Sequence, residues 1–183
     1  MNTHQSILSE LKKLELKPHV NKKILKQFYA RLENPKILRS QNTPDHFCVF
    51  FLPYDKKEQL IYLGHHIKAN DWIPPGGHIE ENENPLDTVK REMSEELSFK
   101  ITNETVELFD ITIKPIETPR PDCIKHWNLW YLVYMDKIDF AFDKGEFYTA
   151  KWVSLQEAKK LMQMQNYNHT LQKLALQGVA LRS

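Results

Sequence analysis

The chain has 183 residues, of which 41% are hydrophobic and 27% are charged, a composition typical of a folded globular protein and not of a disordered or fibrous one. The 25 lysines and arginines nearly balance 24 acidic residues, so we expect no broad positive surface for nucleic acid or an anionic membrane. The longest nearly apolar run, Phe47–Leu52, is far shorter than the roughly 20 residues of a membrane helix. With two cysteines and no secretory signal pattern, the sequence predicts a cytoplasmic protein with reduced, buried thiols.

Two amphipathic helices are predicted at the start of the chain. Apolar residues recur at helical spacing over Ser6–Leu16, and a second helix is expected from a cap at Asn21 to a point before Pro35. We therefore predict a helical extension at residues 1–40, followed by the main domain at residues 41–183. An alternative role for these helices is dimerisation, as in a homodimer, or the binding of another partner, with any enzymatic activity secondary.

Strand patterns begin after this extension. Phe47–Leu52 and Leu60–Leu63 are separated by a polar turn, which predicts a hairpin. Later candidates are strands at Leu108–Ile113, Trp127–Met135 and Tyr148–Val153, a helix at Leu155–Met164 and a further helix after Asn168. Strands and helices in irregular alternation indicate an α+β fold with a mixed sheet.

A glycine pair and a helix stand out between the two groups of strands. Gly76 and Gly77 are adjacent, which predicts a tight turn that brings backbone groups close to a ligand. Asn84 is a suitable helix cap and proline is favoured at the first helical position. These signals predict a helix over Pro85–Leu97.

Three glutamates, Glu92, Glu95 and Glu96, form an acidic stripe beside the apolar face of this helix. Like charges at three- and four-residue spacing destabilise a helix by a few tenths of a kcal/mol per pair. Arg91 can reach Glu95, but it is one cation against three anions. Clustered carboxylates are the ligands that Mg²⁺ or Mn²⁺ prefers, whereas the alternative for a glutamate-rich helix is a solvated acidic face.

The spacing of this segment resembles the Nudix box, which is glycine, five residues, Glu, seven residues, Arg-Glu, an apolar residue, one residue, Glu-Glu, one residue, glycine and an apolar residue. The matching residues here are Gly77, Glu83, Arg91, Glu92, Met93, Glu95, Glu96 and Phe99. Ser98 replaces the final glycine, which normally ends the helix in a left-handed conformation. Serine adopts that conformation at a cost of about 1 kcal/mol, so the change affects stability more than chemistry.

The resemblance implies both a fold and an activity. The fold is an α/β/α sandwich with a mixed sheet, covering about Asp45–Gln165. Nudix hydrolases cleave a phosphoanhydride of a nucleoside diphosphate linked to another group, using water and Mg²⁺ or Mn²⁺. The expected partner is thus a small-molecule nucleoside diphosphate derivative, with no membrane or bulk nucleic acid involved.

The resemblance also implies roles for individual residues. Glu92, Glu95, Glu96 and the carbonyl of Gly77 would bind metal. Arg91 would hold a catalytic glutamate in place, with Glu95 in the catalytic set. Glu83 and Gly76 would support the site.

Glu146 is the candidate for a further catalytic carboxylate. It lies six residues before Trp152, in a segment that resembles the one where some family members carry a loop glutamate as metal ligand or general base. The alternative is an exposed loop acid without a catalytic role.

The substrate is left open. Pro115 lies sixteen residues beyond Phe99, as in some ADP-ribose-cleaving members, but three prolines between residues 115 and 121 are also explained by a loop. Nucleoside triphosphates, dinucleoside polyphosphates and nucleotide sugars are further candidates. A nucleotide-binding or sensor module without catalysis is the alternative function, which the intact glutamates disfavour.

Histidines near the box raise the question of a transition metal. His65, His66 and His78 are candidate ligands for a transition metal such as zinc. Their spacing does not repeat as in known zinc sites, however, and carboxylate oxygens dominate this segment. We therefore expect Mg²⁺ or Mn²⁺, not zinc.

Overall fold

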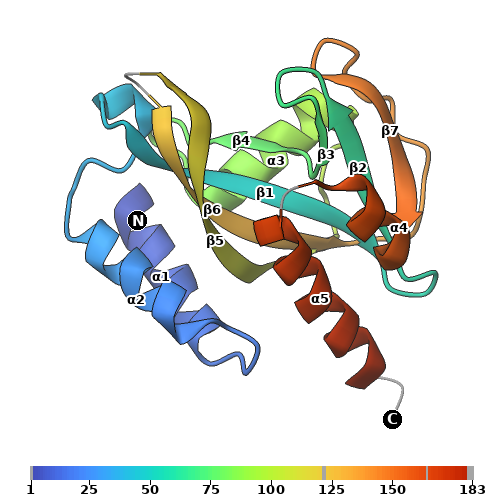
Figure 1. The fold of residues 1–183 in the computed structure, drawn as a ribbon, viewed down its shortest axis with the longest axis horizontal. Coiled ribbons are helices and arrows are strands. Elements are labelled where there is room, and N and C mark those ends of the chain that lie inside the picture. Colours follow the sequence, from blue (N-terminus) through green and yellow to red (C-terminus); the bar gives the residue numbers. More distant parts are fainter. Residues whose placement is uncertain (1, 121–122, 164, 181–183) are drawn as a thin grey trace. The chain divides into compact units, whose positions relative to one another are not determined.

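The computed structural model describes residues 2–120, 123–163 and 165–180 (Figure 1). The helices are α1 (Thr3–Glu15), α2 (Lys22–Leu32), α3 (Pro85–Leu97), α4 (Leu155–Leu161) and α5 (Gln165–Ala180), with a 3-10 turn η1 at Arg39–Gln41. The strands are β1 (Asp45–Asp55), β2 (Leu60–His66), β3 (Asp71–Ile73), β4 (Gly76–His78), β5 (Thr105–Arg120), β6 (Cys123–Tyr134) and β7 (Phe147–Ser154). The combination confirms the α+β fold class.

Hydrogen bonding joins the strands in the order β3-β2-β1-β6-β5, with β4 also paired to β1 and β7 also paired to β2. The chain forms two compact units. Unit 1 consists of residues 1–50, 76–90 and 108–131, and unit 2 of residues 51–75, 91–107 and 132–183.

In unit 1, the two N-terminal helices pack against each other (Figure 1). Asn21 caps α2 as predicted, accepting hydrogen bonds from the backbone N–H groups of Lys23 and Ile24. The fully buried apolar side chains of the pair include Ile7, Leu11, Leu14, Leu25 and Phe28. The Phe28 ring makes edge contacts with Phe47 of β1 and Trp127 of β6. The apolar faces of both helices are therefore buried within this unit.

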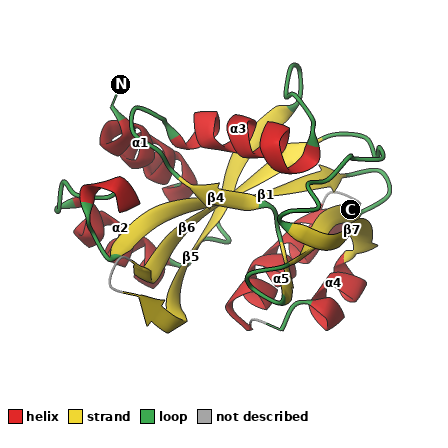
Figure 2. Ribbon diagram, turned by 90° about the horizontal axis from the view of Figure 1, so that it is seen from above, coloured by secondary structure: helices red, strands yellow, loops and turns green. Residues whose placement is uncertain are grey.

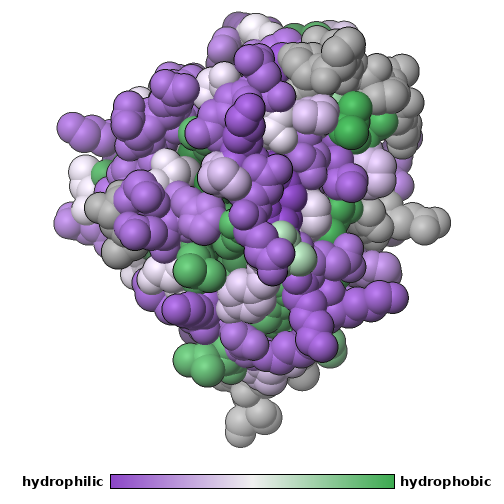
Figure 3. All heavy atoms as spheres, turned by 90° about the vertical axis from the view of Figure 1, so that its left-hand side faces the viewer, coloured by the Kyte–Doolittle hydropathy of each residue, from purple (hydrophilic) through white to green (hydrophobic). Residues whose placement is uncertain are grey.

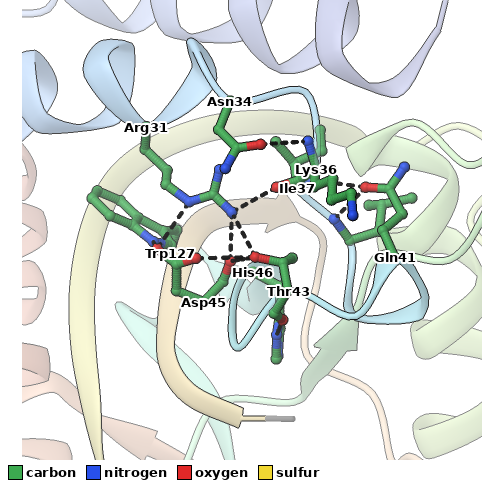
Figure 4. A network of polar contacts seen from close by, with 10 residues as sticks. Arg31, Asn34, Lys36, Ile37, Gln41, Thr43, Asp45, His46 and Trp127 are labelled. Carbon is green, nitrogen blue, oxygen red and sulfur yellow. Dashed lines mark hydrogen bonds and ion pairs between the residues drawn. The ribbon is translucent and has the colours of Figure 1, made fainter.

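Arg31 connects α2 to the start of β1 (Figure 4). Its Nε donates to Asp45 Oδ2 at 3.0 Å, and its Nη2 donates to the Asp45 carbonyl at 2.6 Å and the Lys36 carbonyl at 2.7 Å. Trp127 Nε1 also donates to Asp45 Oδ2, at 3.2 Å. Burial opposes ionisation of Asp45, but the Arg31 charge and these hydrogen bonds hold its pKa below the usual value.

The boundary between residues 1–40 and 41–183 stays a prediction.

In unit 2, the expected hairpin is present. β1 and β2 pair antiparallel, with Tyr54 opposite Ile61 and Asp55 opposite Leu60. β2 also pairs with β3 and β7, and α4 packs against these strands. It also packs against α5 (Figure 2). The later strands and helices lie close to their predicted positions.

Two predicted loops are strands instead. Gly76 and Gly77 form β4, where they pair with Phe50 and Val49, so the prediction of a tight turn was wrong. Pro115 lies within β5, which also contradicts its assignment to a loop. A proline has no backbone N–H to donate to a neighbouring strand. Because β5 lies at the end of the strand order, with a neighbouring strand on one side, it can accommodate a proline.

The surface on the side drawn in Figure 3 is mostly hydrophilic, with hydrophobic groups scattered among polar ones. Among the helices that the structure describes, none combines the length and the apolar character needed to cross a bilayer.

Candidate active site

Helix α3 carries most of the predicted site, and it begins as expected. The Asn84 side chain accepts a hydrogen bond from the Asp87 N–H at 3.1 Å, and the Asp87 carboxylate accepts one from the Asn84 N–H at 3.3 Å. This reciprocal arrangement satisfies backbone donors at the helix start. The observed bounds, Pro85–Leu97, agree with the prediction.

The end of α3 is set by Ser98. Its φ of 51° is left-handed, as expected for the residue in the place of the glycine of the Nudix box. The Phe99 N–H then donates to the Met93 carbonyl at 3.2 Å, which satisfies an acceptor in the last turn. The substitution of serine for glycine thus leaves the helix end in its usual form.

The three glutamates of α3 differ in exposure. Glu92 and Glu96 are only 9% and 5% exposed, whereas the Glu95 side chain is 58% exposed. Val89, Met93 and Leu97 are buried, so the acidic residues flank the buried apolar stripe as predicted. Two carboxylates lie on the core side of the helix and one lies in solvent.

Arg91 links two of these carboxylates. Its Nη1 lies 2.8 Å from Glu92 Oε1 and 3.0 Å from Glu95 Oε2, and the second contact is the ion pair predicted from the four-residue spacing. The three carboxylates lie within two turns of the helix, and Arg91 contacts two of them. Buried carboxylates cost several kcal/mol each unless charge offsets them. Carboxylate oxygens are the donors that a divalent cation such as Mg²⁺ prefers, so the chemistry of these residues suits such an ion.

Glu146 lies in the loop before β7 and forms ion pairs. Its carboxylate contacts Lys68 Nζ at 2.9 Å and His66 Nε2 at 3.3 Å. Burial lowers the pKa of His66, although the nearby Glu146 carboxylate opposes the shift. The lowered pKa weakens the ionic character of the His66 contact, so the ion pair with Lys68 is the principal one.

The same loop is attached to α3 through the backbone. The Asp143 N–H donates to the Glu96 carbonyl at 2.7 Å, and the Glu146 N–H donates to the Asp143 carbonyl at 3.2 Å. Unit 2 therefore contains Arg91, the three glutamates of α3, and a loop that holds Glu146 and is bonded to the last turn of the helix.

Unit 1 contains the glycines of the predicted site. Gly76 has a φ of 150°, and a Cβ there would lie 2.2 Å from the Val49 carbonyl oxygen. Only glycine fits this approach. Gly77, the predicted carbonyl ligand, lies next to it, opposite Val49 in the β1–β4 pair.

Glu83, predicted as a supporting carboxylate, also lies in unit 1. Its Oε2 accepts hydrogen bonds from Thr88 Oγ1 at 2.8 Å and from the Glu80 N–H at 3.2 Å. These contacts join the segment before α3 to the first turn of the helix.

A second cluster in unit 1 was missed from the sequence. His46, His78, Cys123 and His126 lie together, although they come from three strands. Burial, with His78 and His46 nearby, lowers the pKa of His126 to about 3. The Cys-x-x-His spacing at residues 123–126 is the one local signal for this cluster in the sequence.

Comparisons with known proteins agree with this geometry. A family model described as NUDIX domain matches residues 44–174. The bis(5'-nucleosyl)-tetraphosphatase of Mus musculus is 29% identical over 102 residues, covering 55% of this chain and 67% of the relative. An RNA pyrophosphohydrolase of Francisella tularensis is 27% identical over 110 residues, covering 54% of this chain and 71% of the relative.

Solved structures share the fold. The E. coli dihydroneopterin triphosphate pyrophosphohydrolase superposes with a TM-score of 0.65 at 14% identity, over 78% of this chain and 99% of that one. A C. elegans Ap4A hydrolase gives 0.63 at 17% identity, over 73% and 98%. The family match covers most of the chain and includes the acidic helix, so this protein belongs to the Nudix family of enzymes that hydrolyse phosphoanhydrides.

Proposed function

We propose that this protein hydrolyses a phosphoanhydride of a nucleoside diphosphate or polyphosphate derivative, with Mg²⁺ or Mn²⁺ as cofactor. The observation that carries the proposal is the pair of buried carboxylates, Glu92 and Glu96, on one helix, with Arg91 in contact with Glu92. Buried carboxylates at this spacing are chemically suited to a hard divalent cation.

The metal ligands in this proposal are Glu92, Glu95 and Glu96, and the carbonyl of Gly77 stays a prediction from the family resemblance. Bound Mg²⁺ would offset the negative charge of the diphosphate and lower the pKa of a coordinated water. Arg91 restricts the rotamers of Glu92 and Glu95 through its two contacts, which holds the carboxylates ready at low entropic cost. Gly76 and Glu83 keep the backbone before the helix in place.

The proton of the attacking water needs an acceptor. Glu146 is our candidate for this base, with Glu95 as the carboxylate of α3 most exposed to water. In the structure, Glu146 Oε1 lies 2.9 Å from Lys68 Nζ in an ion pair. Substrate binding that draws Lys68 to a phosphate would free the carboxylate for this role.

The substrates for which the relatives are named give an order for testing candidate substrates. The tetraphosphatase and the dihydroneopterin triphosphate enzyme are both named for polyphosphate compounds. We therefore place dinucleoside polyphosphates and nucleoside triphosphates ahead of ADP-ribose and nucleotide sugars. One feature favours ADP-ribose: Pro115 lies sixteen residues beyond Phe99, the spacing found in some ADP-ribose-cleaving members of the family.

A panel of these compounds, incubated with purified protein and Mg²⁺ or Mn²⁺, tests the proposal. Release of a nucleoside monophosphate, pyrophosphate or inorganic phosphate that stops on addition of a chelator supports it. Tight nucleotide binding without any product would favour the alternative, a binding or sensor module.

The cytoplasmic location and a homodimer stay predictions. Cell fractionation tests the location, and light scattering of the purified protein tests the homodimer.

A further inference from the structure

Four side chains in unit 1 converge outside the acidic helix. His46 of β1, His78 of β4, and Cys123 and His126 of β6 each present one ligand atom, and these four atoms all lie within 4.8 Å of one another. Cys123 Sγ lies 3.0 Å from His126 Nε2. The ring centroids of the three histidines are 4.8 to 5.3 Å apart. The convergence therefore includes all three rings.

The protein environment fixes the ring of His46. Its Nδ1 lies 3.2 Å from the Thr43 carbonyl oxygen, and a carbonyl can only accept, so Nδ1 carries the proton (Figure 4). Nε2 is then the lone-pair atom, and it is buried. A backbone carbonyl that orients the far nitrogen of a histidine is the usual outer contact of a metal ligand.

The backbone also holds the two segments of the cluster together. The Ile124 and Lys125 N–H groups both donate to the Pro44 carbonyl, at 2.7 and 3.3 Å. The start of β6 is thereby bonded to the residues just before His46. Cys48, the other cysteine of the chain, is not among the four clustered residues and provides a control.

We propose that His46, His78, Cys123 and His126 form a structural zinc site. Three imidazoles and one thiolate are a donor set that zinc prefers to Mg²⁺ or Mn²⁺, and four protein ligands make a closed site. Zinc bonds of about 2.0 to 2.3 Å in tetrahedral geometry place ligand atoms about 3.3 to 3.6 Å apart. The four ligand atoms lie up to 4.8 Å apart in the structure, so metal binding requires them to move by about an ångström, which side-chain rotations allow.

Such an ion has a structural consequence within unit 1. It joins β1, β4 and β6, and its ligand His78 directly follows Gly77. The zinc site would therefore fix the short strand β4, which has only three residues of its own to pair with β1. This role is separate from the acidic helix and from its divalent cation.

Metal analysis of the whole protein, purified with a non-chelating reductant, tests the site. We expect a single zinc ion per chain, and we expect Co²⁺ exchanged for it to give tetrahedral visible bands and a thiolate charge-transfer band. Cys123→Ser should lose the charge-transfer band and weaken zinc binding by at least about 10- to 100-fold. Cys48→Ser, the matched control, should keep both.

Two further readouts keep the test decisive. The variant Glu96→Gln should retain zinc, because the acidic helix is not part of this site. Circular dichroism shows whether Cys123→Ser is folded, and if it is not, the Co²⁺ spectrum of the wild-type protein decides alone. Absence of zinc uptake by the wild-type protein, a Co²⁺ spectrum without thiolate character, or equal zinc affinity in the two cysteine variants would overturn the proposal.

Discussion

Arg91 contacts Glu92, its immediate neighbour in the chain, at 2.8 Å. Consecutive residues of a helix point about 100° apart and do not ordinarily face each other. The long arginine side chain nevertheless reaches Glu92, and the same Nη1 lies 3.0 Å from Glu95 Oε2, one turn further along the helix. One nitrogen atom thus fixes the relative positions of two proposed metal ligands.

Arg91→Lys should reduce kcat about 100-fold with a smaller change in KM, because a lysine keeps the charge but not the rigid planar group that positions both carboxylates. Steady-state kinetics on the substrate found in the panel measures both constants. Lys90→Ala removes the adjacent exposed cation and should have little effect. Equal kinetics for the two variants would show that Arg91 acts only through its charge.

Gly76→Ala should lower the free energy of unfolding by about 2 kcal/mol or more, since it introduces both a strained φ and a contact with the Val49 carbonyl. Urea denaturation measures the change. Gly145→Ala is a suitable comparison because the atoms nearest to its new Cβ belong to the Asp143 carboxylate, the closest at 3.2 Å. If Gly76→Ala is as stable as Gly145→Ala, the close approach of β4 to β1 is not a real constraint.

Ser98→Gly should raise the free energy of unfolding by about 1 kcal/mol, because glycine adopts the left-handed φ of this position without strain. The opposite sign is expected for Ser94→Gly, which places glycine inside α3 and should cost about 0.5 kcal/mol. Thermal unfolding of the two variants compares them directly. A loss of stability in both would contradict the helix end described above.

The ion pair between Asp45 and Arg31 predicts a pH dependence. The pKa of Asp45 is lower in the folded state, so the pair contributes its full stability above the ordinary aspartate pKa of about 3.9 and loses it as the pH falls through the lower folded value. Asp45→Asn should destabilise the protein by about 2 kcal/mol at pH 7. The difference from wild type should shrink below about pH 4.

Asp136→Asn is the control for this experiment, because Asp136 forms an exposed ion pair with Lys57 that should contribute little. Denaturation curves from pH 7 to pH 3 provide the comparison. If the difference in the free energy of unfolding between wild type and Asp45→Asn stays constant across this range, the pKa of Asp45 is the same in the folded and unfolded states and the account is contradicted.

Strong local patterns made the helices predictable. Asn21 and Asn84 each precede an apolar repeat, and both cap the helices that were expected from them. The acidic stripe followed from spacing alone, since residues 92, 95 and 96 must share a side of any helix. The burial of Glu92 and Glu96 beside an exposed Glu95 required the structure, because it depends on which strands and loops pack against the helix.

Long-range pairing could not be predicted from local patterns. Gly76 and Gly77 looked like a turn, because glycine permits many conformations and a three-residue strand has no recognisable period. The cluster around His46 and Cys123 was missed for a related reason. Its members are separated by up to 80 residues, so only the pairing of β1 with β4 and the bonds at the start of β6 bring them together.

Turnover of Glu96→Gln with Mg²⁺ tests the central claim most directly. The exchange removes one buried negative charge and preserves the shape of the side chain, and Glu58→Gln in an exposed turn serves as the control. We predict that Glu96→Gln remains folded and loses several orders of magnitude in kcat, whereas Glu58→Gln is as active as wild type. Near-normal turnover by Glu96→Gln would contradict the assignment of the acidic helix as the metal-binding centre.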